Sequence, residues 1–266
     1  MKQAGCIRTL RDKGLTVEVY ENTEAMGRAA AAAAAQRLRE LAASSDVFGV
    51  ILATGASQMA TLEALTSTPG LPWEKVVGFH MDEYLGISDQ HRASFRRYMR
   101  ERLVDKVKMR QFYFLDGSAA DADETCRKYA ECLQQYRPQL CLLGIGENGH
   151  IAFNDPMEAD FHDPLEVKVV SLDQECRQQQ VSEGWFASIP EVPERALTLT
   201  IPVLLRVPQL IASVPSQRKA NIVRRTLTEE ISTRCPATIL RTHPNTTIYL
   251  DPASAAELPP EDDSAR

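Results

Sequence analysis

Short apolar runs alternate with longer amphipathic stretches along most of the chain. Apolar runs of roughly four to eight residues bounded by glycine or polar residues are typical of buried strands, whereas apolar residues at every third or fourth position predict helices. The strands expected on this basis are residues 16–20, 49–53, 76–80, 112–115, 140–143, 168–172, 197–200, 210–214 and 247–250. The expected helices are residues 24–43, 58–65, 94–103, 122–136 and 217–227, the first of them capped by Thr23.

This alternation of strands and helices predicts an α/β fold with a modified Rossmann-like, mostly parallel sheet and helices on both of its faces. We expect a single domain over residues 1–257, because no repeat and no long linker interrupts the pattern. Residues 258–266 are rich in proline and acidic side chains, so we expect them to form a flexible tail.

The composition is ordinary for a soluble globular protein and argues against several classes of function. Of the 266 residues 44% are hydrophobic, and the net charge of -6 argues against nucleic acid as the main partner. No apolar stretch approaches the roughly 20 residues that span a bilayer, and the N-terminus lacks the apolar segment of a secretory signal. The six cysteines form no CxxC pair. We therefore expect a reduced, cytoplasmic protein without zinc and without a membrane partner.

Two loops that follow expected strands carry candidate chemistry, and parallel strands would bring such loops to one edge of the sheet. Thr54, Gly55 and Ser57 precede a helix, where backbone N–H groups and hydroxyls bind anions such as phosphate; a simple helix cap would use the same residues. Asp82 and Glu83 follow the next strand. One of these carboxylates could serve as a general base, although aspartate is also a common turn residue.

The third loop, which follows the strand at 140–143, is the most informative segment. Residues 144–149 include three glycines, which let a backbone turn sharply and approach a ligand. His150 comes next and can act as both acid and base, and Glu147 and Asp155 are close enough in sequence to orient its ring. Lys219 lies near the start of a later helix, where it could contact the same phosphate or simply be solvated.

The order and spacing of these motifs resemble those of the glucosamine-6-phosphate deaminase family, from about residue 16 to residue 257. The matching motifs are LATGAS at 52–57, FHMDEY at 79–84, GIGENGHIAFNDP at 144–156, ALTLT at 196–200, KA at 219–220 and LRTHP at 240–244. The wider superfamily also contains 6-phosphogluconolactonases, which share the phosphate loop and a glycine–histidine motif. The MDEY loop and the AFN segment are similar to those of the deaminase branch.

The resemblance implies conversion of glucosamine 6-phosphate to fructose 6-phosphate with release of ammonia, without a metal or an organic cofactor. His150 corresponds to the histidine that assists opening of the sugar ring. Asp82 corresponds to the base that moves a proton between C2 and C1. Gly55, Ser57 and Lys219 correspond to phosphate-binding positions.

Several positions depart from the family pattern. Asp155 stands where glutamate is the familiar partner of the histidine, and its shorter side chain is expected to need a backbone shift or a bridging water. Asn148 occupies a position that is often aspartate and that also pairs with the histidine. The family's phosphate-binding arginine has no clear counterpart: Arg177 is nearby, but the match places a glutamine of residues 178–180 there. Residues 215–218 lack the glycine that is often found before the lysine.

Two other functions stay open alongside deamination. A hydrolase of sugar-phosphate lactones would need the histidine and the phosphate loop but has less use for Asp82 as a base at C2. A sugar-phosphate sensor would bind the ligand without turnover. Release of ammonia, opening of a lactone, or binding alone would distinguish the three. The sequence also leaves open whether the protein forms a homo-oligomer.

We expect no activation by N-acetylglucosamine 6-phosphate and hyperbolic saturation with substrate. Residues 157–166 do not resemble the basic activator-binding segment of allosteric deaminases, and this acidic stretch would repel a phosphate dianion. Initial rates measured across substrate concentrations, with and without the acetylated sugar phosphate, test this expectation. A sigmoidal curve that becomes hyperbolic on adding that compound would contradict it.

Overall fold

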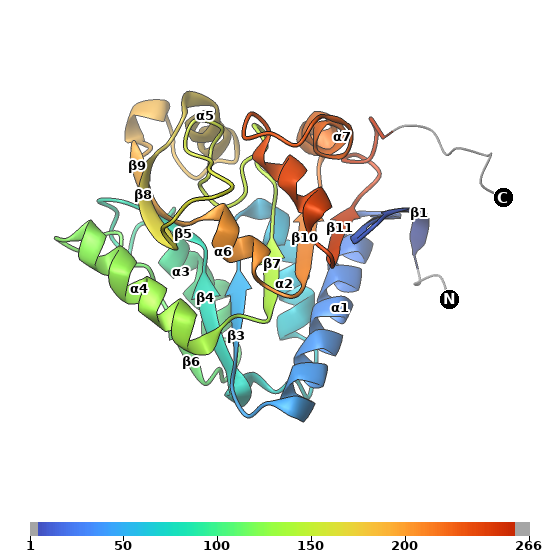
Figure 1. The fold of residues 1–266 in the computed structure, drawn as a ribbon, viewed down its shortest axis with the longest axis horizontal. Helices are drawn as coiled ribbons and strands as arrows, with labels where there is room; N and C mark the ends of the chain where they lie inside the picture. Colours follow the sequence, from blue (N-terminus) through green and yellow to red (C-terminus); the bar gives the residue numbers. More distant parts are fainter. Residues whose placement is uncertain (1–4, 259–266) are drawn as a thin grey trace.

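A computed structural model describes residues 5–258 of the chain (Figure 1). The larger of its two sheets has the strand order β1-β2-β11-β10-β7-β3-β4-β6, and every neighbouring pair runs parallel except the β1–β2 hairpin. Its strands are β1 (Cys6–Asp12), β2 (Leu15–Tyr20), β3 (Phe48–Leu52), β4 (Val76–His80), β6 (Gln111–Tyr113), β7 (Leu140–Leu143), β10 (Leu210–Val214) and β11 (Thr246–Leu250). The expected α/β fold class with a mostly parallel sheet is confirmed.

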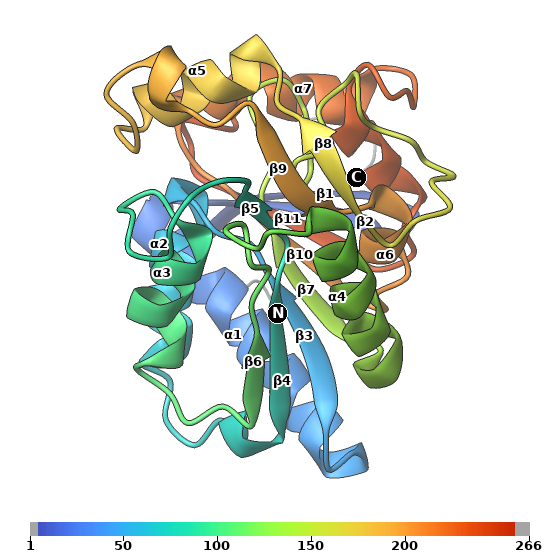
Figure 2. The ribbon, with the colours of Figure 1, turned by 90° about the vertical axis from the view of Figure 1, so that its left-hand side faces the viewer.

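A second, three-stranded antiparallel sheet lies beside the carboxyl edge of the first (Figure 2). Its order is β5 (Asp82–Tyr84), β9 (Arg195–Leu199) and β8 (Val167–Ser171). The expectation that residues 168–172 and 197–200 belong to the parallel sheet is therefore wrong. Apolar alternation reveals a strand but not the partner with which it pairs, and β9 pairs with β5, which starts two residues after β4 ends.

Helices cover both faces of the large sheet, as expected. Alternate side chains of each buried strand face opposite sides, so Val50 and Leu52 join one core while Ile51 joins the other. The core with Val50 is covered by α1 (Thr23–Ser44), α2 (Met59–Thr66) and α3 (Phe95–Met99). The core with Ile51 is covered by α4 (Ala122–Tyr136), α6 (Ile201–Leu205) and α7 (Ala220–Thr228). The remaining helix, α5 (Gln174–Ser182), lies with α7 beyond the carboxyl edge of the sheet (Figure 1).

Several elements begin or end at residues other than those predicted from the sequence. The residue that caps α1 is Asn22, whose side chain accepts from the Ala25 N–H at 2.8 Å, while the Thr23 hydroxyl donates to Asp251 instead. The expected helix at 94–103 is α3, capped by Ser94, followed by a π-helical turn. Of the expected tail, Leu258 is buried, and residues 259–266 lie outside the described part of the chain.

The close packing of α1 on α2 depends on Gly27. A Cβ added at Gly27 would lie 2.5 Å from the Ala60 Cβ and 2.7 Å from the Ala60 carbonyl carbon. Replacing an ordinary helical glycine gains stability, but here the added atoms meet backbone that cannot yield without a shift of α2. This position therefore sets the distance between the two helices.

We expect Gly27→Val to lower the free energy of unfolding by about 1–3 kcal/mol, because it overpacks this contact. Ala32→Val is the matched control, since Ala32 is exposed on the same helix and the change there costs only about 0.5 kcal/mol of helix propensity. Chemical denaturation of both variants measures the difference. Equal losses would show that the α1–α2 contact tolerates the side chain.

Candidate active site

Loops from four neighbouring strands meet at the carboxyl edge of the large sheet and enclose a cleft of about 180 Å³. The loops follow β3, β4, β7 and β10, which are adjacent in the sheet although far apart in sequence. Seven of the residues singled out from the sequence line this cleft: Thr54, Gly55, Ser57, Asp82, Glu147, His150 and Lys219. Asn148 and Asp155 are buried behind the histidine.

The backbone conformation of the loop after β3 fixes the position of that loop at the cleft. Gly55 has φ 96°, a value that side chains rarely adopt, although the space around it is free. Its carbonyl accepts from the Tyr98 hydroxyl at 2.9 Å, which ties the loop to α3. Beneath the loop, the buried Gln58 side chain donates to the Ser57 hydroxyl and to the Leu143 carbonyl, each at 3.0 Å. The loop is thus rigidly fixed with its N–H groups near the start of α2.

Asp82 and Glu83 have different environments, because successive residues of β5 face opposite sides. Asp82 lines the cleft with 7% of its surface exposed, and burial, together with the charge of Glu83, raises its pKa well above the usual range. Glu83 is fully buried and accepts five hydrogen bonds, from the Ser94 hydroxyl and from N–H groups of Tyr84, Phe95 and Arg96. Glu83 is therefore a structural carboxylate, whereas Asp82 is free for chemistry.

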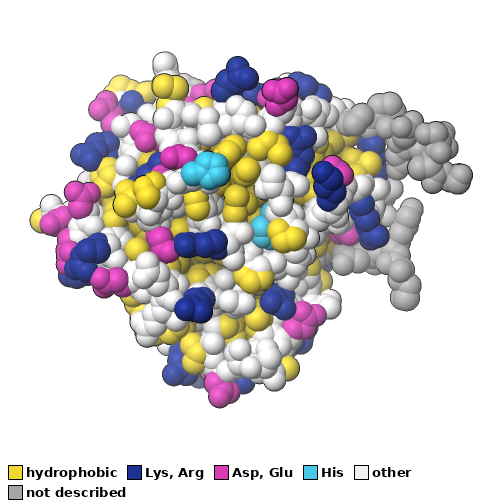
Figure 3. Space-filling model, in the orientation of Figure 1, with side chains coloured by type: hydrophobic (Ala, Val, Ile, Leu, Met, Phe, Trp, Pro, Cys, Tyr) yellow, Lys and Arg dark blue, Asp and Glu magenta, His cyan; other side chains and the backbone are white. Residues whose placement is uncertain are grey.

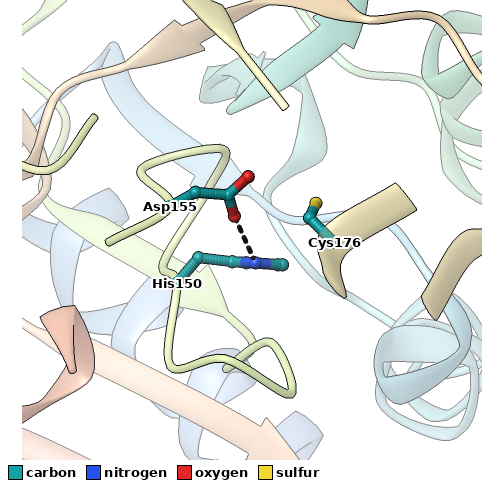
Figure 4. A group of neighbouring side chains, drawn as sticks. All are labelled: His150, Asp155 and Cys176. Atoms are coloured by element: carbon teal, nitrogen blue, oxygen red, sulfur yellow. Dashed lines mark ion pairs between the residues drawn. The ribbon is translucent and has the colours of Figure 1, made fainter. Parts of the chain in front are cut away.

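The His150 ring is fixed from two sides. Its Nδ1 lies 2.9 Å from Oδ1 of Asp155 (Figure 4), so of the two expected adjustments, a backbone shift or a bridging water, the water is not needed. The aspartate reaches the ring because the intervening loop turns through Ala152, whose φ is 49°. On the other side, a Cβ at Gly146 would lie 2.2 Å from the ring Nε2, so only glycine allows this close approach. With Nδ1 engaged, Nε2 is the nitrogen left for the cleft.

Asn148 pairs with the histidine through the His150 backbone rather than through its imidazole, and its amide connects two carboxylates. Its side-chain amide donates to Asp155 at 3.0 Å and to Asp173 at 2.8 Å, and its oxygen accepts from the His150 backbone N–H at 3.0 Å. Burial alone would raise the pKa of Asp155, but His150, Asn148 and the Asp173 N–H hold that pKa below its usual value. A neutral donor is suited to a position between two carboxylates.

Cys176 completes the group around Asp155, since donor atoms of His150, Asp155 and Cys176 all lie within 4.8 Å of one another (Figure 4). These atom types are zinc ligands. However, both oxygens of Asp155 already accept hydrogen bonds, and burial raises the pKa of the Cys176 thiol well above its usual range. The arrangement fits a thiol that hydrogen-bonds to Asp155 better than a thiolate bound to a metal.

Lys219 is a buried cation that faces the cleft, with 6% of its surface exposed. Burial lowers its pKa, and the nearby carboxylates of Glu183 and Glu147 oppose that shift. Among residues 5–258, no group forms a hydrogen bond or an ion pair with its Nζ. The turn before it contains Ser216 at φ 90°, a strained value for serine at the segment where the family often has glycine.

A rim of polar side chains borders the cleft, and α5, which carries its glutamines, was not predicted as a helix because it has no clear apolar period. Gln179 accepts from the Glu147 N–H at 3.0 Å and donates to Glu183 at 2.7 Å, and Trp185 donates to Glu183 at 3.1 Å. Gln179 and Gln180 line the cleft. Arg177 does not: its guanidinium donates to two backbone carbonyls at 2.8 and 2.9 Å, which agrees with the glutamine match.

The outer surface carries charges of both signs. On the face shown in Figure 3, Lys and Arg side chains are interspersed with Asp and Glu, and this face has no extended basic surface of the kind that binds nucleic acid. Within residues 5–258, no helix combines the length and the apolar character that crossing a bilayer requires.

Comparison with known proteins identifies relatives over most of the chain. The family model described as glucosamine-6-phosphate isomerases/6-phosphogluconolactonase matches residues 21–249. A glucosamine-6-phosphate deaminase of Bacillus cereus is 32% identical over 200 residues, which are 75% of this chain and 74% of the relative. A glucosamine-6-phosphate deaminase of Thermoanaerobacter pseudethanolicus is 30% identical over 256 residues, which are 93% of this chain and 97% of the relative.

Solved structures show the same fold. A protein described as a monomeric glucosamine-6-phosphate deaminase superposes with a TM-score of 0.82 at 28% identity, covering 91% of this chain and 99% of that one. A 6-phosphogluconolactonase of Thermotoga maritima superposes with a TM-score of 0.73 at 19% identity, covering 89% of this chain and 99% of that one. The second likeness concerns the fold alone.

We expect Asp82→Asn to raise the melting temperature at pH 7–8, with the gain shrinking toward zero near pH 4. The raised pKa of Asp82 means that the folded protein keeps the proton to higher pH than the unfolded chain does, so ionisation of Asp82 costs stability as pH rises. A gain of 1 kcal/mol corresponds to roughly 2–4 °C in a domain of this size.

Thermal melts from pH 4 to pH 8 measure this effect, with the exposed Asp105→Asn as the control that should show no trend. An Asp82→Asn variant that is less stable than the parent at pH 8 would show that the carboxylate is well compensated in the folded state.

Proposed function

The chain belongs to the family of glucosamine-6-phosphate isomerases and 6-phosphogluconolactonases, and from this premise we propose that it converts glucosamine 6-phosphate and water to fructose 6-phosphate and ammonia. Its relatives make it an enzyme of the glucosamine-6-phosphate deaminase kind, and the family acts on sugar phosphates. The observation that carries the proposal is one cleft in which Lys219, a buried cation that forms no ion pair within residues 5–258, accompanies Asp82 and His150.

The phosphate group is bound between the loop after β3 and Lys219. N–H groups at the start of a helix and the Thr54 and Ser57 hydroxyls supply hydrogen bonds to its oxygens, and Lys219 supplies charge. A buried ammonium that is not in direct contact with a carboxylate is costly in the free protein. Binding of an anion relieves that cost, which supports a phosphate as the missing partner.

His150 opens the sugar ring by moving a proton from the O1 hydroxyl to the ring oxygen O5. The Nδ1 of the ring is engaged by Asp155, so Nε2 is the atom that exchanges the proton with the sugar. Asp155 fixes the ring orientation and stabilises the imidazolium that forms transiently. Asn148 acts indirectly, because its hydrogen bond to Asp155 keeps that carboxylate in place.

Asp82 then takes the proton from C2 of the open aldehyde form and returns it to C1. In the same isomerisation O1 gains a proton and the amine nitrogen loses one, so the aldehyde becomes a C1 hydroxyl and the C2 amine becomes an imine. Water adds to the imine carbon, and ammonia then leaves as the C2 ketone forms. A carboxylate whose pKa is raised by burial is a stronger base than an exposed one once it is ionised, and it can return the proton readily. In this proposal residues 1–257 act as one domain, because every cleft loop follows a strand of the same sheet or of the small sheet beside it.

We expect Asp82→Asn to lower ammonia release by about 10²–10⁴-fold while leaving the dissociation constant for the sugar phosphate nearly unchanged, because the amide has the shape of the carboxylate but cannot accept the proton. Ammonia release is measured over a panel of amino-sugar 6-phosphates, and binding is measured by calorimetry. Asp105→Asn, which removes an exposed aspartate away from the cleft, is the control that should retain full activity.

Other outcomes would identify the alternatives. Hydrolysis of 6-phosphogluconolactone without ammonia release from any amino sugar would replace deamination by lactone hydrolysis. Binding of sugar phosphates without any product would indicate a sensor. Full ammonia release by the Asp82→Asn variant would remove Asp82 from the proton transfer.

A further inference from the structure

Two cations that are adjacent in sequence line the cleft, in contrasting environments. Lys219 is almost completely buried, whereas Arg218 is exposed. Burial lowers the pKa of Lys219, and the charge of Arg218 lowers it further, so the guanidinium is close enough for its field to act on the ammonium. Two cations held near one another repel, and an anion between them would remove that repulsion.

Arg218 has no partner among residues 5–258, since no hydrogen bond or ion pair of its guanidinium occurs there. Other arginines of the same segment do have partners: Arg224 lies 3.3 Å from Glu257, and Arg225 lies 2.8 Å from Glu229. An exposed guanidinium that is not engaged elsewhere can turn toward a ligand without breaking an existing contact.

The cleft also contains carboxylates that oppose an anion beside Lys219. Glu147 and Glu183 both line it, and both act on the charge of Lys219. Glu183 is fixed in place because Gln179 and Trp185 donate to its two oxygens. A phosphate dianion next to Lys219 therefore lies in the field of two carboxylates as well as that of the lysine, and a second cation would offset the carboxylates.

We propose that Arg218 is a second phosphate-binding residue of this cleft and that its guanidinium closes over the anion opposite Lys219. The negative charge of Glu183 weakens phosphate binding and so sets its strength. The planar guanidinium can donate two parallel hydrogen bonds to phosphate oxygens, which an ammonium cannot do. The inference rests on the proposed function in one respect, that the anion anchored at Lys219 is the phosphate of the substrate.

The test is the dissociation constant for inorganic phosphate, measured by calorimetry on the full chain. We expect Arg218→Gln to weaken binding by about tenfold, which is the loss of one charge-assisted contact in a partly hydrated site. Arg218→Lys should lie between the parent and Arg218→Gln. Arg224→Gln removes the same charge from the same segment outside the cleft and should leave binding unchanged.

Glu183→Gln tests the opposing charge, and we expect it to tighten phosphate binding severalfold. The assignment of Arg218 would be overturned if the Arg218→Gln and Arg224→Gln variants bound phosphate with equal affinity. It would also be overturned if the parent protein did not bind phosphate. Weaker binding by Glu183→Gln would overturn the role of Glu183 as a counter-charge.

Phosphate binding can be measured without turnover. The role of Arg218 and the deaminase activity can therefore be contradicted independently of each other. Phosphate binding that depends on Arg218, in a protein that releases no ammonia, would retain the anion site and reject deamination. Ammonia release with a Michaelis constant unaffected by Arg218→Gln would retain deamination and reject the role of Arg218.

Discussion

The buried carboxylate of Glu83 connects the strand that carries the candidate base to the helix that supports the phosphate loop. It accepts five hydrogen bonds from β5 and from the start of α3, and it pairs with Arg96, which also contacts Asp116. Because α3 begins at this carboxylate, Tyr98 on the same helix can reach the Gly55 carbonyl. A charge buried so completely must keep all of its partners, since the loss of one leaves another charge uncompensated. The relative positions of Asp82 and the phosphate loop therefore depend on this network.

The loop that carries His150 places an imidazole, which can gain and lose a proton, next to several carboxylates. Asp155 is the one that contacts the ring, and Asn148 separates it from Asp173 with hydrogen bonds to both. An aspartate at position 148 could not donate to either neighbour, so in this chain the neutral amide is a matched partner of the shorter Asp155. The two departures from the family pattern thus belong to one arrangement.

The sequence predicted most of the large sheet and most of the cleft, for reasons that are visible in particular residues. Buried strands such as β3 are continuous apolar runs, and parallel order brings their ends together, which is why Thr54, Asp82, His150 and Lys219 could be assigned to one place. Pairing of β9 with β5, by contrast, depends on contacts that leave no periodic signal. The polar helix α5 and the exposed strand β1 were missed because neither has a regular apolar face. The direct Asp155–His150 contact depends on a turn at Ala152, an alanine with nothing unusual about it in sequence.

The strand order also has a consequence for the way in which the protein is synthesised. Strand β2, near the N-terminus, pairs with β11, the last strand within residues 5–258, at Val17 and Ile248 among other positions. Strands β3, β4, β6 and β7 are adjacent to one another and are complete by residue 143, so they can associate while the ribosome is still adding residues. One edge of β2 gains its β11 partner only after residue 250 has left the exit tunnel, and until then the emerging chain presents that strand edge unpaired.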